Sequence, residues 1–489
     1  MEKKRKTPNV ILIVIDALRA RNLGCYGMQG EPSPNIDKVA SESTLFEKAF
    51  SCWNTTDQSL TSILTGKYPR SHGIMNHGDK VTEEERRLFL ETGTKLLAQY
   101  MKQSGHKTLA VDWMSRWFKE GFDDYGYELE RRGLDRLKYH LVTLPGLYRD
   151  YLLGHLPILK LYKPMRKSSP KELIKGMKDV LSTFAFTFNL AKLQDARFVT
   201  QIANDLIDHS QENPFFLFLH YWDTHTPYYC PKSYLDKSSI YDSKSLLMEK
   251  YRGSVKYVDF QLGKLFNHLK ENQLWDDTLL IITSDHGDSL TEHDIYFDHH
   301  GLYDETTHVP LIMHYPESIP AGKRIESFVQ HVDLVPTLCD LFDINCNIDE
   351  LDGNTLLPII RGDKTAHRDE IFVEESYVQK KSAIRTEDYK YIYAVDNDGW
   401  CNYCQKVHVG REELYDLNED PAELTDIAPQ QKELAENMRS ELLAKVKTLD
   451  MKRQQLRQKY KPQNGELSIE PDSDDEELIK ERFKKLGYM

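Results

Sequence analysis

Three apolar runs, each ending in or followed by polar side chains, constrain the fold of this chain more than any other feature. They cover residues 9–16, 214–220 and 278–285, and Val, Ile, Leu and Phe dominate them. Continuous apolar runs of this length are typical of strands buried on both faces of a parallel sheet. Helical patterns lie between them, as expected for an α/β fold. Ligands of such sheets bind at the carboxyl ends of strands, so a site is expected near Asp16 and Asp285.

Length and composition indicate a folded chain of more than one domain. The 489 residues allow about two to three domains, and 40% hydrophobic with 11% aromatic residues argue against disorder. The net charge of −13 lacks the basic footprint of a nucleic-acid-binding protein. Seven scattered cysteines favour reduced thiols over a disulfide framework. Cys401 and Cys404 have redox or zinc spacing, but without a second pair a chance or structural pair is the favoured interpretation.

The sequence carries no pattern typical of export or of membrane spanning. Residues 1–8 run directly into the first expected strand, without the separate apolar segment of a secretory signal. No run of about 18 apolar residues follows. We therefore expect a cytoplasmic protein.

The pattern divides the chain into a large α/β domain at 1–370, a small α+β subdomain at 371–450 and a charged tail at 451–489. Within the large domain, residues 117–213 break the βα rhythm and are expected to form a mostly helical insertion or lid. Packing on the parent domain is favoured over contact with a membrane surface or an acyl chain. The small subdomain is expected to pair an antiparallel sheet with a helix near 430–448. The tail is expected to be solvated, with a role in homo-oligomer assembly as the alternative.

Thr56 lies in the stretch 54–69, which carries a hydroxyl-rich loop, then an apolar helical turn, then a Gly/Pro stop. A hydroxyl at the start of a helix lies where free N–H groups and the helix dipole favour negative charge, so an anionic ester could bind beside it. The alternative is an ordinary helix cap, and the same alternative applies to Asp16 after the first run.

Histidines gather after the later apolar runs. Asp285 and His286 are adjacent, and a carboxylate beside an imidazole is suited to a divalent metal. His225 follows the second run and is placed for substrate contact or proton transfer. Glu292, His293, His299 and His300 crowd the next loop, where one or two of them could hold an anionic oxygen or another metal.

In order and content, these motifs resemble the sulfatase family of the alkaline-phosphatase superfamily, whose members are metal-dependent ester hydrolases. The motifs that carry the resemblance are residues 9–19, 33–37, 64–69, 217–228, 284–287, 302–310, 333–338, 352–358, 384–392 and 413–421. The resemblance implies an alkaline-phosphatase-like α/β sandwich: a large mixed, mostly parallel sheet flanked by helices, with a small C-terminal antiparallel sheet and a helix.

The chain departs from the family at its nucleophile. Sulfatases carry a Cys or Ser, oxidised to formylglycine, ten residues before the Gly of Leu-Thr-Gly; here that position is Thr56, counted from Gly66. Threonine cannot form the aldehyde, so formylglycine is not expected, and Cys52 is four residues too early. The family's Gly-Lys-Trp-His segment is also absent. Asp285-His286 instead resembles the threonine-dependent phosphotransfer branches, which include nucleotide phosphodiesterases and lipoteichoic-acid-type phosphoglycerol transferases.

The resemblance implies one divalent cation, Mn²⁺, Mg²⁺, Ca²⁺ or Zn²⁺, at a centre formed by four side chains of this chain. These metal ligands are Asp16, Thr56, Asp285 and His286. Thr56 would attack the ester and His225 would assist the leaving oxygen. The substrate's remaining oxygens would be bound by Lys67, His299 and His300.

Phosphate mono- or diester hydrolysis is the favoured activity, on a small-molecule, glycan-linked or lipid-linked ester. The alternatives are sulfate-ester hydrolysis by an unmodified threonine, transfer of a phospho-alcohol group to a glycan or lipid, and a sulfatase-like protein that only binds anions. Retention of Thr56, Asp16, Asp285 and His286 argues against the last alternative.

Overall fold

A large mixed sheet forms the centre of the structure, a computed structural model that describes residues 7–114, 116–125, 194–210, 212–395 and 412–460. Within these residues its eight strands follow the order β4-β3-β5-β1-β6-β7-β2-β8. The strands are β1 (Asn9–Ile15), β2 (Thr44–Phe50), β3 (Lys107–Val111), β4 (Asp124–Tyr125), β5 (Phe215–Tyr221), β6 (Thr278–Thr283), β7 (Leu311–His314) and β8 (Lys323–Gln330). Strands β4, β3, β5, β1 and β6 run parallel, whereas β7 is antiparallel to both β6 and β2. The expected mixed, mostly parallel sheet is confirmed.

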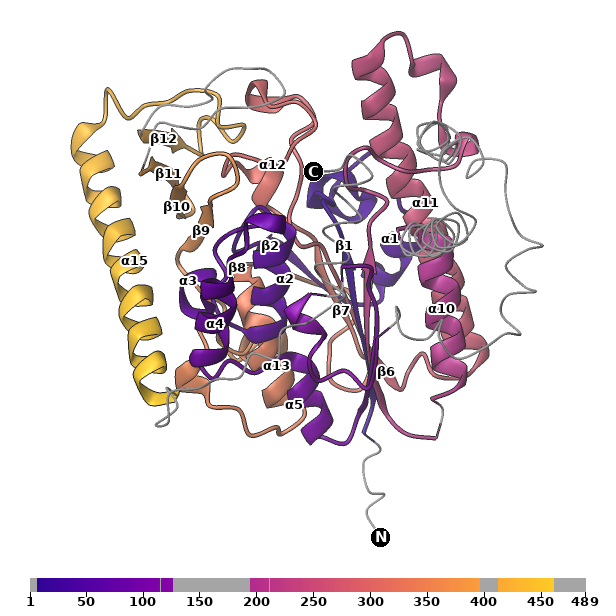
Figure 1. The fold of residues 1–489 in the computed structure, drawn as a ribbon. Coiled ribbons are helices and arrows are strands. Elements are labelled where there is room, and N and C mark those ends of the chain that lie inside the picture. The colour runs from indigo at the N-terminus through magenta and orange to yellow at the C-terminus, as the bar shows by residue number, and fades with distance from the viewer. Residues whose placement is uncertain (1–6, 115, 126–193, 211, 396–411, 461–489) are drawn as a thin grey trace, which may run out of the picture. The chain divides into compact units, whose positions relative to one another are not determined.

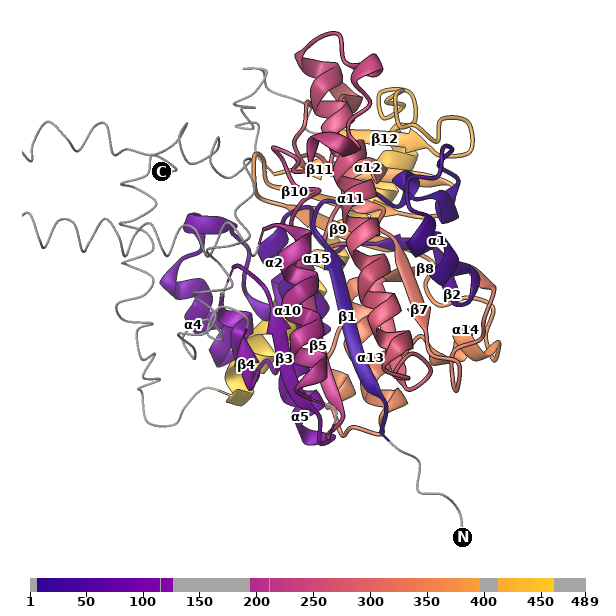
Figure 2. The ribbon, with the colours of Figure 1, turned by 90° about the vertical axis from the view of Figure 1, so that its right-hand side faces the viewer.

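The middle strands are buried on both faces, which explains their continuous apolar sequences. Residues 10–15 of β1 are all 0% exposed. On one face, α10 (Ala196–Asp208) and α11 (Ser243–Glu271) cover the sheet (Figure 2). On the other face, α2 (Thr56–Thr65) and α13 (Leu334–Leu341) pack their apolar side chains against β1 and β6 (Figure 1). This layering leaves the carboxyl ends of the middle strands surrounded by loops.

The remaining α-helices are short and lie around this core. They are α1 (Pro34–Ser41), α3 (Pro69–His72), α4 (Glu83–Glu91), α5 (Leu97–Gln103), α12 (Asp304–Thr307) and α14 (Leu357–Arg361). Among the described residues, none of the helices combines the length and the apolar character that spanning a bilayer requires.

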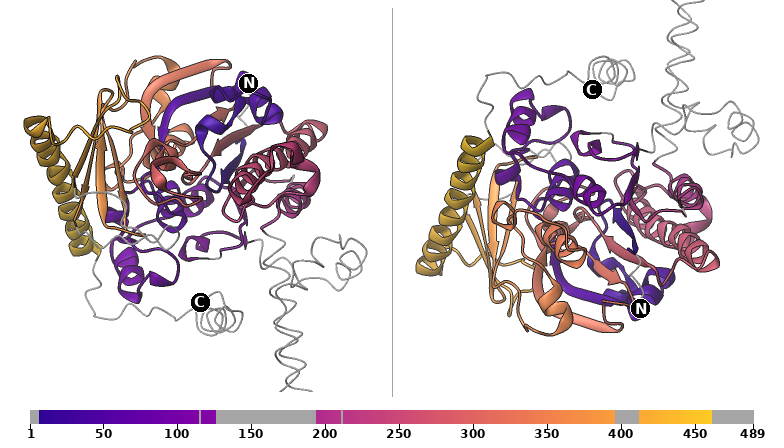
Figure 3. Two further views of the ribbon diagram at one scale, coloured as in Figure 1. Left: turned by 90° about the horizontal axis from the view of Figure 1, so that it is seen from above. Right: turned by 90° about the horizontal axis from the view of Figure 1, so that it is seen from below.

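A second, antiparallel sheet joins the large one near the C-terminus. Its strands, in the order β12-β11-β10-β9, are β9 (Ile371–Glu375), β10 (Lys381–Arg385), β11 (Tyr389–Ala394) and β12 (Glu412–Asp416). The helix α15 (Lys432–Tyr460) covers this sheet on the side away from α10 and α11 (Figure 3). Phe372, Ile384 and Tyr391 of the sheet form one apolar cluster with Met438 and Leu442 of α15. The expected small sheet with a helix is therefore confirmed.

Several boundaries differ from those expected. The helix α15 extends beyond residue 448 to Tyr460, because Leu449 and Leu456 are buried and Arg457 pairs with Glu91 of α4 at 2.9 Å. Within the expected insertion, residues 124–125 form β4 and residues 196–208 form α10, both parts of the main fold. The rest of that insertion, residues 126–193, lies outside the described residues, as do Cys401, Cys404 and the tail from 461.

Candidate active site and metal centre

Four predicted residues meet at the carboxyl end of the large sheet. Asp16 follows β1, Asp285 and His286 follow the neighbouring β6, and Thr56 begins α2. The Thr56 hydroxyl oxygen Oγ1 lies 3.4 Å from Asp16 Oδ2 and 3.4 Å from His286 Nε2. All four side chains are buried. The structure thus brings the predicted nucleophile into one cluster with the predicted metal ligands.

The two carboxylates of this cluster suit a cation. Asp16 and Asp285 are both 0% exposed, and neither Asp16 Oδ1 nor Asp285 Oδ2 has a hydrogen-bond partner. Burial, together with the nearby charge of Asp285, raises the pKa of Asp16 to about 8. Buried carboxylate oxygens without partners are costly, and a divalent cation removes both the desolvation penalty and the repulsion. The oxygens that the structure leaves unpaired are therefore those a metal would take.

His286 is oriented as a metal ligand. Its Nδ1 lies 2.7 Å from the Gly287 carbonyl oxygen, which can only accept a hydrogen bond, so Nδ1 carries the proton. The other nitrogen, Nε2, then carries the lone pair. It lies 3.5 Å from Asp285 Oδ2 and 3.8 Å from Asp16 Oδ1, so a cation could be shared among the three atoms. Burial lowers the pKa of His286 to about 3, so the imidazole is neutral, which is the form that binds metals.

His220, within β5, is a site residue that the sequence did not reveal. Its Nε2 lies 3.3 Å from Asp16 Oδ2, and ligand atoms of Asp16, His220 and Asp285 all fall within 4.8 Å of one another. Its Nδ1 contacts Asp112 at 2.7 Å, and Asp112 accepts a second hydrogen bond from the Tyr125 hydroxyl at 2.5 Å. Although burial lowers its pKa, the hydrogen bonds to Asp112 and Asp16 raise it to about 10. Without a cation the ring therefore carries positive charge beside Asp16, and a cation bound there would displace the Nε2 proton and leave a neutral imidazole oriented by Asp112.

An arginine and a histidine also lie against Asp57, the residue after the nucleophile. Asp57 Oδ2 accepts a 2.6 Å hydrogen bond from the Gly78 amide and lies 3.1 Å from His77 Nδ1. Its Oδ1 lies 3.5 Å from Arg116 Nε. Burial alone would raise the pKa of Asp57, but Arg116 and His77 lower it, so the carboxylate is charged and holds both side chains. Arg116 and His77 were not predicted from the sequence, since both lie outside the strand-end motifs.

A row of imidazole rings borders the pocket. The ring of His299 lies 4.7 Å from that of His286 and 6.0 Å from that of His225. His225 stacks on Trp222 at 4.0 Å, and its Nδ1 contacts the Thr226 carbonyl oxygen at 2.7 Å. Burial and His299 together lower the pKa of His225 to about 4. The structure therefore places two of the predicted substrate-handling histidines beside the metal cluster.

The other two predicted substrate ligands are placed differently. His300 turns toward Asp298, with 3.4 Å between Nδ1 and Oδ2. Lys67 follows Gly66, which ends α2, whereas Thr56 begins this helix. The 10 residues of α2 separate them by about 15 Å along the helix axis. Lys67 is 2% exposed, and its Nζ donates to Thr94 Oγ1 at 3.0 Å. The structure does not bring Lys67 to the nucleophile.

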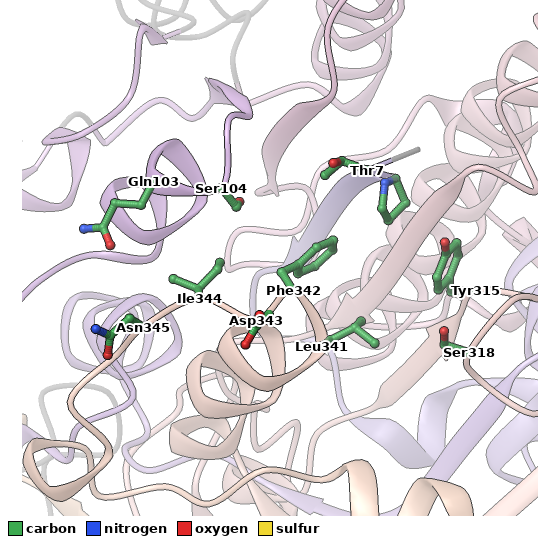
Figure 4. A pocket seen from close by; sticks show the side chains of 11 residues that line it. Thr7, Gln103, Ser104, Tyr315, Ser318, Leu341, Phe342, Asp343, Ile344 and Asn345 are labelled. Carbon is green, nitrogen blue, oxygen red and sulfur yellow. The ribbon is translucent and has the colours of Figure 1, made fainter. Parts of the chain in front are cut away.

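A separate hollow of about 500 Å³ opens at the opposite, amino-terminal end of β1. Thr7, Ser104, Tyr315 and Phe342 are among its lining residues (Figure 4). The buried carboxylates, imidazoles and Thr56 lie at the other end of the sheet, so the chemistry is assigned there rather than to this hollow.

The fold and the cluster at its strand ends define the class of alkaline-phosphatase-like ester hydrolases. Within that class the chain belongs to the sulfatase family, whose model, described as "Sulfatase", matches residues 8–344. A second model, described as "N-sulphoglucosamine sulphohydrolase, C-terminal", matches residues 291–449. The protein is therefore a sulfatase-family hydrolase of sulfuric or phosphoric esters.

Comparison with individual proteins agrees with this assignment. The chain is 25% identical to an N-acetylgalactosamine-6-O-sulfatase of Bacteroides thetaiotaomicron over 493 residues, covering 90% of this chain and 93% of the relative. The crystal structure of Ps i-CgsB in complex with k-i-k-neocarrahexaose is similar with a TM-score of 0.64 and 22% identity, covering 90% and 93% of the two chains. The phosphonate monoester hydrolase of Agrobacterium radiobacter has a TM-score of 0.61 and 20% identity, covering 92% and 96%. These two structures show a shared fold.

Proposed function

We propose that the protein hydrolyses phosphate mono- or diesters, with Thr56 as the nucleophile and one divalent cation held by Asp16, Thr56, Asp285 and His286. The observation that supports this most strongly is the position of Thr56 Oγ1, 3.4 Å from both Asp16 Oδ2 and His286 Nε2. Its place in the first turn of α2 adds free backbone N–H groups next to the attacked ester.

The cation, Mn²⁺, Mg²⁺, Ca²⁺ or Zn²⁺, supplies charge that lowers the pKa of the Thr56 hydroxyl and offsets the charge of the ester. The hydroxyl of Thr56 faces Asp16 Oδ2, which is the acceptor for its proton. Attack by Thr56 Oγ1 forms a bond to phosphorus, and the bond from phosphorus to the leaving oxygen breaks. Water then attacks the resulting threonine ester, releasing phosphate from a monoester substrate or a phosphate monoester from a diester, and Thr56 regains its hydroxyl proton from Asp16.

His225 donates a proton to the leaving oxygen in the first step and accepts a proton from water in the second. Because its Nδ1 proton is donated to the Thr226 carbonyl oxygen, its other nitrogen, Nε2, has the lone pair of the neutral ring and is the atom that gains and loses a proton. Its pKa of about 4 makes it neutral before substrate binds, so it can accept a proton from water. An anionic ester beside the ring raises that pKa and favours the protonated form that assists the leaving oxygen.

The nonbridging oxygens of the ester are bound by the surrounding cationic and imidazole groups. Arg116, held by Asp57 next to the nucleophile, supplies charge, and His77, held by the same carboxylate, supplies a ring N–H. His299, whose ring lies 4.7 Å from that of His286 and 6.0 Å from that of His225, borders the same pocket. We include His300 as an outer contributor through Asp298, and we leave Lys67 out of the pocket because of its place at the far end of α2.

Sulfate-ester hydrolysis by the unmodified threonine is the second candidate. It is favoured by the relatives, which include the N-acetylgalactosamine-6-O-sulfatase and an arylsulfatase of Clostridium perfringens. The similarity to a phosphonate monoester hydrolase shows that the same fold also serves phosphorus chemistry. Substitution of threonine at the formylglycine position favours the phosphate ester here. A glycan-linked ester agrees with the sugar substrates in the names of the relatives.

Turnover of matched substrates tests the proposal. An aryl phosphate, a bis-aryl phosphodiester and an aryl sulfate are offered to the chelator-treated protein with each of the four cations added back. We expect cation-dependent release from the phosphate esters, a loss of about 10³-fold or more in kcat for Thr56→Ala, and retained turnover for Thr56→Ser. Acid-quenched peptides should carry phosphate on Thr56.

Three results would change the conclusion. Full turnover by Thr56→Ala rules out the nucleophile. Release from the aryl sulfate alone selects the second candidate. A product that forms only when glycerol or a sugar alcohol is added identifies a transferase.

A further inference from the structure

A second cluster of possible metal ligands lies apart from the candidate active site. His293 belongs to the short helical turn Glu292–Asp294, Glu305 lies on α12, and Glu423 lies between β12 and α15. One ligand atom from each falls within 4.8 Å of the other two. Figures 1 and 2 both show α12 beside the small sheet, so the cluster joins a loop of the large domain to the C-terminal segment.

The three side chains are buried, and two of them direct an atom without a hydrogen-bond partner into the cluster. Their side chains are 7%, 5% and 1% exposed for His293, Glu305 and Glu423. His293 Nε2 and Glu305 Oε2 are buried without a hydrogen-bond partner, whereas Glu423 Oε1 is paired with Lys390 Nζ at 2.6 Å. The first two lie only 3.4 Å apart. Such atoms are costly to bury unless something binds them.

Contacts outside the cluster fix the remainder of each side chain and so orient the ligand atoms. Glu305 Oε1 accepts from Arg21 at 2.7 Å, and Glu423 Oε2 accepts from the Asp304 amide at 2.8 Å. The ring of His293 stacks on Tyr303 with 3.6 Å between centroids and 6° between planes. Each ligand is therefore held in orientation by a contact outside the cluster, as outer hydrogen bonds orient the ligands of metal sites.

Lys390 is the cation that already contacts the cluster. Its Nζ lies 2.6 Å from Glu423 Oε1 and 2.8 Å from Asp304 Oδ1. It is shared between two carboxylates and has no contact with His293 or Glu305 among the ion pairs of the described residues. Asp304 Oδ1 also lies 3.3 Å from Arg385 Nε. Lys390 and Arg385 can therefore both pair with Asp304 while Glu423 Oε1 binds a metal.

We propose that this cluster is a second divalent-cation site, of the Zn²⁺ type, with His293, Glu305, Glu423 and a water molecule as ligands. One imidazole and two carboxylates suit Zn²⁺, and tetrahedral bonds of about 2.1 Å separate neighbouring ligand atoms by roughly 3.4 Å. The His293–Glu305 separation of 3.4 Å has this value. Glu423 Oε1, which already lies within 4.8 Å of the other two ligand atoms, completes the site by exchanging its pairing with Lys390 for the cation.

The site has a structural role that connects it with the active site. Residues 289–303 run from the Asp285–His286 pair to α12 and carry His299. Glu305 also lies against the metal-binding loop, because a Cβ on Gly287 would fall 2.1 Å from the Glu305 carbonyl oxygen. A cation bound by His293, Glu305 and Glu423 therefore connects the loop that carries His299 to the segment between β12 and α15.

Metal counting on the full-length protein tests this site independently of the reaction. The chelator-stripped protein is titrated with Zn²⁺, desalted and analysed for bound metal per chain. We expect two Zn²⁺ in the wild type, one in His293→Ala and one in Asp285→Asn, with none in the double variant. His268→Ala is the matched control, since it removes an imidazole 2.9 Å from Asp208 at the surface, and it should keep both ions.

The proposal fails if Asp285→Asn binds no Zn²⁺, or if His293→Ala keeps two, because His293 and Glu305 then form an ordinary ion pair. Glu305→Gln and Glu423→Gln, whose folding is checked by circular dichroism, answer the same question if His293→Ala does not fold. Each should weaken the second Zn²⁺ by at least tenfold in competition with a chromophoric chelator. Unchanged affinity in both glutamine variants overturns the proposal.

Discussion

Asp112 accepts a 2.7 Å hydrogen bond from Nδ1 of His220, while the opposite ring nitrogen of His220 lies 3.3 Å from Asp16. Three neighbouring strands supply these residues, because Asp112 follows β3, His220 lies in β5 and Asp16 follows β1. The arrangement is the carboxylate–histidine pair that orients imidazoles around metals. It gives Asp112 a positioning role at the metal centre without direct contact with the substrate.

Asp112→Asn should therefore weaken the catalytic cation. The amide holds His220 less firmly, and loss of such outer contacts lowers metal affinity by about 10- to 100-fold. The check is the concentration of Mn²⁺ needed for half-maximal phosphoesterase activity, with kcat at saturating Mn²⁺ changed much less. Asp123→Asn, which alters a carboxylate bonded to Thr108 in the same region, is the control and should leave the cation requirement unchanged. An unchanged requirement in Asp112→Asn removes the positioning role.

Gly287→Ala should disrupt the metal-binding loop. Its Cβ would lie 2.1 Å from the Glu305 carbonyl oxygen, and the Gly287 amide bonds to the Thr306 carbonyl oxygen at 2.8 Å, so the loop cannot move away freely. We expect a loss of about 1 to 3 kcal/mol in unfolding free energy, typical of overpacking, together with weaker cation binding. Urea denaturation and metal analysis measure both. Gly30→Ala offers a contrast, since nothing lies within 4 Å of its added Cβ although its φ is +88°; it should leave cation binding intact.

The strands that could be read from the sequence are those with both faces buried. β1, β5 and β6 are apolar at nearly every position, so composition alone reveals them. β8 was not predicted, because it lies at the sheet edge and mixes buried Ile325 with exposed Arg324 and Glu326. The length of α15 also escaped prediction, because its last turns are stabilised by contacts such as Arg457 with Glu91, 366 residues away in the chain. Long-range contacts of this kind leave no local pattern.

The difference between local sequence signals and long-range contacts also separates the site residues that were predicted from those that were missed. Asp16, Thr56 and Asp285 stand at the ends of elements, where their positions follow from topology. His220 contributes through the register of three strands, which the sequence does not state. Lys67 was assigned to the substrate from the family resemblance, but it follows the C-terminal end of α2, whereas Thr56 begins this helix.

Arg116→Gln should weaken substrate binding more than it slows chemistry. Arg116 Nε lies 3.5 Å from Oδ1 of Asp57, the residue after Thr56. Its charge there attracts an anionic ester. We expect KM for the aryl phosphate to rise about tenfold, equal to about 1.4 kcal/mol, with a smaller change in kcat. Arg87→Gln, on the exposed side of α4, is the matched control. A KM that does not change in Arg116→Gln would place the guanidinium outside the substrate's reach.

His299 should make the folded state sensitive to acid. Burial and the neighbouring His286 lower the pKa of His299 to about 3, whereas in the unfolded chain it is about 6.5. Between these values the unfolded state binds one more proton than the folded state, so the free energy of unfolding falls as the pH falls. The slope from this residue is about 1.4 kcal/mol per pH unit.

His299→Gln removes that contribution and should therefore be less acid-sensitive than the wild type. Between pH 6.5 and 5.0, urea denaturation should show the wild type losing about 2 kcal/mol more than the variant. His209→Gln, at the exposed C-terminal end of α10, should follow the wild-type curve. Parallel curves for wild type and His299→Gln would mean that His299 is protonated equally in both states, and the neutral imidazole proposed beside His286 and His225 would then be excluded.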